Sequence, residues 1–178
     1  AWAVEQGYTL VHVVHKVNRP RYITKPIEPF AEIQIKKIFK KCRGWRERAI
    51  VLIFLDCGIR ASELVSLTVD DWIQGSLIVP NCYGKKAWKV PITEFTERAI
   101  FRSLGKRVIY PNGMGGSCSL FSSQYPSLAL SYEAIRALMG RLEERSSVPN
   151  VHAHRFRHTF AINYPRNNGD IYTLKRIL

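Results

Sequence analysis

The run of seven consecutive apolar residues from Ala49 to Leu55 constrains the fold of this chain more than any other feature of its sequence. A segment that is apolar on every side offers no face to water, so it must be buried and covered by other elements. Periodicity alone does not distinguish a buried strand from a buried helix. Gly58, which suits the left-handed end of a helix, and the run that begins at Arg46 favour a helix.

The rest of the chain supplies short elements that can cover this segment. Apolar residues at helical spacing, with lysines on the other faces, predict an amphipathic helix over about 31–42. Two β-prone runs at 76–80 and 87–92 predict an antiparallel hairpin, and 105–126 is expected to be mostly loop. Further helices are expected at 60–67, at 93–104, after a cap at Ser131, at 153–167 and at 170–178. The sequence therefore predicts a mainly α fold with a small antiparallel β-sheet, in the α+β class.

A length of 178 residues suits one domain with a core of its own. The stretch 16–29 contains three prolines and no periodic apolar pattern, which is typical of an extended linker. We therefore place a boundary near residue 26. Residues 26–178 are expected to form the folded domain, and residues 1–25 to belong to a linker and to whatever lies before it.

Basic residues are concentrated near this boundary. The chain has a net charge of +13, and residues 16–48 alone hold eleven Lys or Arg against three Glu. Such an excess suits a polyanionic partner, above all nucleic acid. The predicted DNA contacts are Lys36, Lys40, Arg43 and Lys86, although a helix face that is merely solvated remains an open alternative for the lysines of residues 36–41.

The same composition excludes other classes. Charged residues interrupt every apolar run before it reaches membrane-spanning length, so no membrane partner is expected. The four cysteines are far apart and include no Cys-x-x-Cys pair, which favours a reducing cytoplasm over a disulfide framework or a zinc knuckle. His152, His154 and His158 could form a metal site, but no Glu follows the first of them as in a zincin helix, so no metal is expected.

Three short motifs of the sequence are informative because of their order and spacing. They are Cys57-Gly-Ile-Arg-Ala-Ser-Glu-Leu, then Gly84-Lys85-Lys86 in the hairpin, then His154-Arg-Phe-Arg-His-Thr-Phe-Ala161. In order and spacing this set resembles the catalytic domain of the tyrosine recombinase (phage integrase) family, over residues 26–178. The opening stretch, Trp2 to Tyr8, looks like the end of the last helix of the family's separate core-binding domain.

The resemblance implies a catalytic role for four residues. Arg60 and Arg157 would hold the scissile phosphate, because planar guanidinium groups match its non-bridging oxygens. His154 lies three residues before Arg157, so a helix puts both on one face, where the imidazole can bind the same phosphate or assist proton transfer. Lys85 would protonate the leaving 5′ oxygen, with Lys86 as its rival. The two arginines are expected in an open basic cleft, where they contribute little to the core.

Two departures from the family pattern bear on activity. The family continues with a Gly-His pair and a nucleophilic tyrosine, whereas this sequence stops at Leu178. Tyr164 and Tyr172 fall on the wrong elements, so the 178-residue chain alone is expected to be inactive. Pro165 stands where the family usually has leucine, and it is expected to kink or end the helix that carries Arg157.

Taken together, the resemblance implies site-specific DNA recombination through a 3′-phosphotyrosine intermediate on double-stranded DNA. Self-association in a tetrameric synapse is expected, and no cofactor is required because the covalent link keeps the bond energy. A non-catalytic DNA-binding relic or regulator of the same fold is the alternative. A basic RNA-binding module is disfavoured, because no RNP-type aromatic strand or Gly-x-x-Gly loop lies among the basic stretches.

Overall fold

The structure is a computed structural model, and it describes residues 5–8, 27–80, 87–105, 118–122 and 129–177. Several predictions therefore lie outside the described residues. These are most of the linker and preceding segment at 1–25, the hairpin turn at 81–86 with its two lysines, and most of the loop at 105–126.

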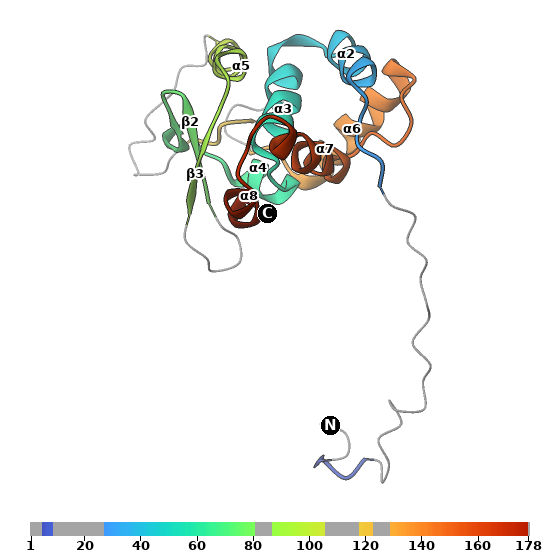
Figure 1. Cartoon of the computed structure of the whole chain (residues 1–178), viewed down its shortest axis with the longest axis vertical. Coiled ribbons are helices and arrows are strands. Elements are labelled where there is room, and N and C mark those ends of the chain that lie inside the picture. Colours follow the sequence, from blue (N-terminus) through green and yellow to red (C-terminus); the bar gives the residue numbers. More distant parts are fainter. Residues whose placement is uncertain (1–4, 9–26, 81–86, 106–117, 123–128, 178) are drawn as a thin grey trace.

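The apolar run forms the central helix, as predicted. Helix α3 spans Gly44–Cys57, and Ile50, Val51, Ile53 and Phe54 on it are fully buried. It lies between α5 (Glu94–Leu104) and α7 (Ala153–Arg166), which cover two of its sides (Figure 1). The helix was the correct choice over a strand because 14 residues of helix, apolar nearly all round, fill the centre of the domain.

Gly58 ends α3 in the left-handed conformation, at φ 59°. A Cβ on this residue would stand 2.1 Å from Cδ1 of Phe160 on α7. Glycine is therefore required twice, by its backbone conformation and by the aromatic ring packed against it. This close approach brings the end of α3 against the helix that carries the second arginine motif.

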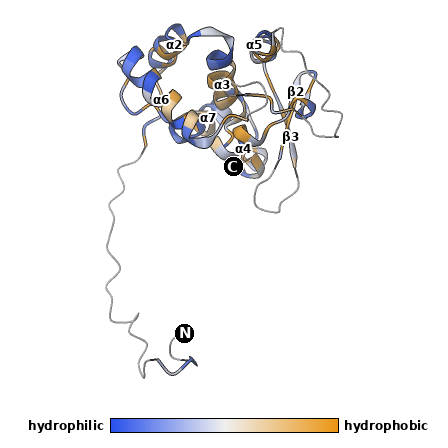
Figure 2. Ribbon diagram, turned by 180° about the vertical axis from the view of Figure 1, so that it is seen from behind, coloured by the Kyte–Doolittle hydropathy of each residue, from blue (hydrophilic) through white to orange (hydrophobic). Residues whose placement is uncertain are grey.

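Helix α2 (Glu32–Lys40) is amphipathic, as its spacing predicts. Ile38 is buried, and Cys42 just beyond the helix is buried as well, whereas the lysines are exposed. Its inner face packs toward α6 (Tyr132–Ser146), whose buried residues Ile135, Leu138, Met139 and Leu142 share one face. Figure 2 shows hydrophilic segments on the outer sides of these two helices.

The small sheet has three antiparallel strands in the order β1-β2-β3. Strands β2 (Ser76–Val79) and β3 (Trp88–Pro91) form the predicted hairpin, with Leu77 opposite Val90. The two-residue strand β1 (Trp72–Ile73) and the 3₁₀ turn before it (Val69–Asp71) were not predicted. A strand this short shows no alternation for a sequence pattern to detect.

The remaining helices agree with the predicted boundaries. They are α4 (Ala61–Ser66), α5, α6 with Ser131 as its cap, α7, and α8 (Ile171–Ile177). Pro165 lies inside the last turn of helix α7, which ends one residue later at Arg166, close to the end that the proline predicts. Within the described ranges, no helix combines the length and the apolar character needed to cross a bilayer. The fold is mainly α with a small antiparallel sheet, as the sequence predicted.

Candidate active site

The structure brings three of the four residues assigned to catalysis into one pocket. Arg60, His154 and Arg157 line a pocket of about 220 Å³, together with Tyr132 from the start of α6. Arg60 is the N-cap residue of α4, His154 lies in the first turn of α7, and Arg157 follows one turn later. Two motifs about a hundred residues apart in the sequence therefore meet in space.

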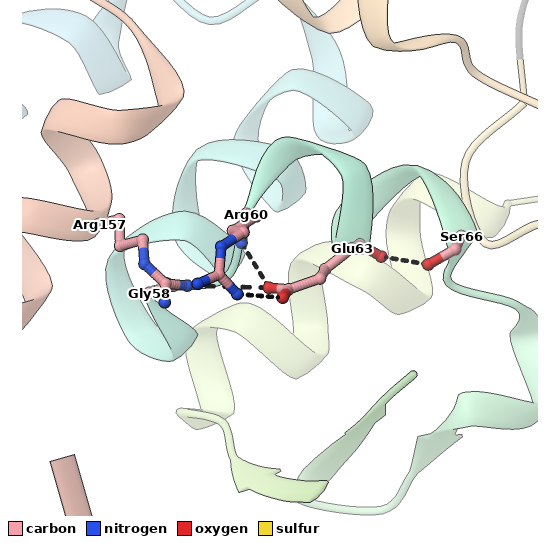
Figure 3. Close-up of polar contacts among 5 residues, drawn as sticks. All are labelled: Gly58, Arg60, Glu63, Ser66 and Arg157. Atoms are coloured by element: carbon pink, nitrogen blue, oxygen red, sulfur yellow. Dashed lines mark hydrogen bonds and ion pairs between the residues drawn. The ribbon is translucent and has the colours of Figure 1, made fainter. Parts of the chain in front are cut away.

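A buried carboxylate links the two arginines. Glu63 is 1% exposed, and its Oε1 accepts a hydrogen bond from Nη1 of Arg60 at 2.8 Å. Its Oε2 accepts from the backbone N–H of Arg60 at 2.7 Å and lies 3.8 Å from Nη1 of Arg157 (Figure 3). One carboxylate therefore orients two guanidinium groups and leaves the trio with one net positive charge.

Arg157 is a buried residue, which corrects the expectation that both arginines lie in an open cleft. Only 7% of the residue is exposed, and Nη1 donates a 2.7 Å hydrogen bond to the carbonyl oxygen of Gly58 at the end of α3. Burial lowers the pKa of its guanidinium from the ordinary value, and the nearby charge of Arg60 lowers it further, while Glu63 opposes both. The expectation fails because the Phe160–Gly58 contact draws α7 against α3 and encloses the side chain between them.

Arg60 differs from Arg157 in its exposure. Its side chain is 44% exposed where it borders the pocket, although its other side contacts Glu63. A guanidinium that is oriented by a buried carboxylate and is still partly exposed at a pocket is suited to bind an anion. The pocket therefore has the chemistry of a phosphate site, with one exposed and one buried arginine.

His152 and His154 have different surroundings and different contacts. His154 is exposed and lines the pocket, whereas His152 caps α7 by accepting the backbone N–H of Arg155 on its Nδ1 at 3.2 Å. Burial lowers the pKa of His152, and the neighbouring His154 and Arg155 lower it further. Over the residues that the structure covers, no three His, Cys, Asp or Glu side chains group together as metal ligands.

The other predicted site residues are not in this pocket. Lys85 and Lys86 lie outside the described residues. Lys36, Lys40 and Arg43 are exposed but lie at the opposite end of α3, where Arg43 is the N-cap residue. Because 14 helical residues rise about 21 Å, the structure does not join these three cations to the pocket, and their DNA contact stays a prediction.

Sequence reasoning missed Glu63 as a site residue. Part of the signal was present, since a Glu at the third position of a helix commonly accepts the backbone N–H of the N-cap residue, as Glu63 does from Arg60. Its second task, pairing with Arg157, depends on how α7 packs and has no local signal. Arg155, which belongs to the same motif as His154 and Arg157, does not line the pocket: its Nε donates to the carbonyl of Glu28 at 2.9 Å, and its guanidinium lies over the ring of Phe30.

Comparison with known proteins gives a consistent result. Residues 29–178 match the phage integrase family. The tyrosine recombinase XerC of Lacticaseibacillus casei is 25% identical over 158 residues, which cover 84% of this chain and 53% of the relative. XerA of Saccharolobus solfataricus is 26% identical over 178 residues, covering 99% of this chain and 56% of that protein. The chain thus spans about half the length of these relatives.

Solved structures share the fold. The crystal structure of a XerA recombinase superposes with a TM-score of 0.75 at 24% identity, over 90% of this chain and 57% of the other. A lambda integrase dimer bound to a COC′ core site gives a TM-score of 0.73 at 16% identity, over 99% of this chain and 51% of the other. With this fold, and with its sequence matched from residue 29 to residue 178, the chain belongs to the phage integrase family.

Proposed function

We propose that this chain carries the phosphate-binding part of the active site of a site-specific DNA recombinase. The observation that carries the proposal is the pocket in which Glu63 holds Arg60 beside Arg157, with His154 at its edge. Family membership supports the same reading, as do relatives and structural neighbours that are themselves recombinases.

In the proposed reaction a tyrosine oxygen attacks the scissile phosphorus and the 5′ oxygen of the DNA leaves. Negative charge then grows on the non-bridging oxygens, and the two guanidinium groups stabilise it with parallel hydrogen bonds. His154 binds the same phosphate or moves a proton, and Lys85, or its rival Lys86, protonates the leaving oxygen. Attack by a 5′ hydroxyl on the 3′-phosphotyrosine reverses these bond changes and rejoins the strands, so neither ATP nor a metal is needed.

We propose that neither tyrosine of the last two helices is the nucleophile. The ring of Tyr164 packs against Phe160 with centroids 5.3 Å apart, and Gly169 folds back so that its N–H donates to the Tyr164 carbonyl at 2.9 Å. Tyr172 lies on α8 and is 81% exposed. On this view neither Tyr164 nor Tyr172 forms a covalent adduct with DNA.

The partners of the proposed enzyme follow from its chemistry. Its substrate is double-stranded DNA, which the net charge of +13 suits, and strand exchange between two duplexes requires several copies of the enzyme to assemble. Such an enzyme acts where the DNA is, in the cytoplasm of a prokaryotic cell. Residues 1–25 would belong to a linker and to the end of a preceding DNA-binding domain.

The test is single-turnover cleavage of a nicked duplex by the native protein with Arg60→Lys. An ammonium keeps the charge but cannot span two oxygens, so cleavage should fall about 10²-fold or more. Duplex binding should change far less, because one of many phosphate contacts is altered. Arg141→Lys, on the exposed side of α6, is the matched control and should cleave like the wild type.

Two results would count against the proposal. Cleavage at the wild-type rate by a folded Arg60→Lys variant would remove Arg60 from the scissile phosphate. Duplex binding by the native protein without any cleavage would instead favour a DNA-binding regulator of the same fold.

A further inference from the structure

A second groove lies away from the candidate active site. It has a volume of about 510 Å³, lies between α5 and the turn after β1, and shares no residue with the pocket around Arg60. Its lining residues are Trp72, Gln74, Glu94, Glu97, Arg98 and Phe101. Phe101 is 69% exposed, and an aromatic side chain left open beside a groove is typical of an interaction surface.

The charge of this groove is opposite to that of the whole molecule. Among the described residues that line it, Glu94 and Glu97 are accompanied by one cation, Arg98, which pairs with Glu94 at 2.6 Å. Glu97 is fixed by the backbone N–H of Gly75, at 3.0 Å. On a chain of net charge +13, the groove is therefore a locally acidic and apolar site, and its complement is an apolar side chain flanked by cations.

The outer face of α2 is such a complement. Ile33 is 65% exposed and lies on one helical face with Lys36, Lys37 and Lys40. The inner face, with Ile38, packs into the core and anchors the helix. Figure 1 shows α2 and α5 on opposite sides of α3, so this face cannot reach the groove of its own molecule.

We propose that the outer face of α2 docks in the α5 groove of a second copy of this chain. Ile33 would pack against Trp72 and Phe101, and Lys37 and Lys40 would approach the two carboxylates. Because the two surfaces lie on opposite sides of one molecule, the contact is head-to-tail and can join more than two copies. A nine-residue helix covers less area than a standard interface, so the contact is weak and easily reversed.

Sedimentation velocity of the full chain at low salt, without DNA, tests the contact. Glu94→Lys in one variant and Lys37→Glu with Lys40→Glu in another should each weaken self-association at least tenfold. Mixing the two variants should restore association, because each then meets a face of opposite charge. Phe101→Ala should weaken it without any change of charge.

The matched control is Glu133→Lys, which makes the same charge reversal in the first turn of α6, outside the groove. It should associate like the wild type, and thermal unfolding should confirm that every variant is folded. The proposal is overturned if the wild type stays monomeric at all concentrations, or if mixing fails to restore association.

A different result would reassign the surface. If the α2 variant loses duplex affinity while self-association is unchanged, this face binds DNA and the docking proposal is wrong. The inference rests on the assembly of several copies stated under the proposed function and names a contact surface for it. Its test uses no DNA cleavage, so the docking contact and the recombinase chemistry can fail separately.

Discussion

At the scale of single residues, the candidate site depends on groups that serve the fold and the pocket together. Glu63 accepts the backbone N–H of Arg60 at the start of α4 and pairs with both arginines. Arg157 links α7 to α3 by donating to the carbonyl oxygen of Gly58, the C-cap residue of α3. A buried ion pair is costly to break, because the remaining partner stays in the low-dielectric interior without its counter-charge.

Arg157→Ala should therefore destabilise the fold. It removes the donor to the Gly58 carbonyl and leaves Glu63 with Arg60 as its cationic partner, so we expect a loss of about 3 kcal/mol in the free energy of unfolding. Arg60→Ala should cost less, about 1 kcal/mol, because that side chain is 44% exposed. Urea denaturation of the two variants measures the difference, and equal losses would contradict the buried role of Arg157.

The cap at His152 should make stability depend on pH. Its pKa is lowered from the ordinary value of 6.5, so the folded state resists protonation more than the unfolded chain does. The stability is complete above about pH 6.5 and declines as the pH falls, because Nδ1 must stay unprotonated to accept the Arg155 N–H. Glu143 partly opposes this shift and softens the decline.

His152→Asn keeps an N-cap acceptor that does not titrate, so thermal unfolding of this variant should change less than that of the wild type between pH 7 and 5. His152→Ala should lower stability at neutral pH by about 1 kcal/mol. An identical pH dependence in wild type and His152→Asn would show that another group controls the acid response.

At the scale of elements, the joint between α3 and α7 is the critical contact. Gly58→Ala should cost about 3 kcal/mol, since it combines left-handed strain with a clash against Phe160. Gly44 provides a matched control, because it is also left-handed but a Cβ there would meet nothing within 4 Å. Gly44→Ala should therefore cost only about 1 kcal/mol by denaturant unfolding, and equal costs would exclude the clash.

The elements differ in how far the sequence reveals them. Helix α3 was predictable because a continuous apolar run with a glycine stop has few solutions, and α2 because its apolar residues keep one face. Strand β1 was not, since its two residues are placed by pairing with β2 rather than by their own pattern. The burial of Arg157 had no local signal either, because it depends on which residues of α3 pack against α7.

The sequence indicated three residues of the candidate site, but it did not indicate the carboxylate that connects the two arginines. Motif order selected Arg60, His154 and Arg157, and the pocket contains all three. Their connection through Glu63 is tertiary, and spacing within a motif cannot show that the same carboxylate reaches a second element.

At the scale of the whole molecule, basic side chains lie near both ends of α3. The pocket lies at its C-terminal end and the exposed cations of α2 lie near its N-terminal end. Duplex binding should be strongly salt-dependent, and for about six neutralised phosphates log K should fall against log salt with a slope near −5. Fluorescence anisotropy over a salt series measures the slope, and a flat dependence would exclude a phosphate-dominated contact.

The hydrogen bond from Arg157 to Gly58 also has a genetic consequence. Because Arg157 supports the core and also borders the pocket, mild substitutions around this joint should behave as temperature-sensitive alleles, with the proposed recombination activity kept at low temperature and lost on warming. Substitutions confined to the exposed His154 should instead abolish recombination at every temperature while protein levels stay normal. A screen scored at two temperatures would thus separate, on one helix, the alleles that unfold the protein from those that disable its chemistry.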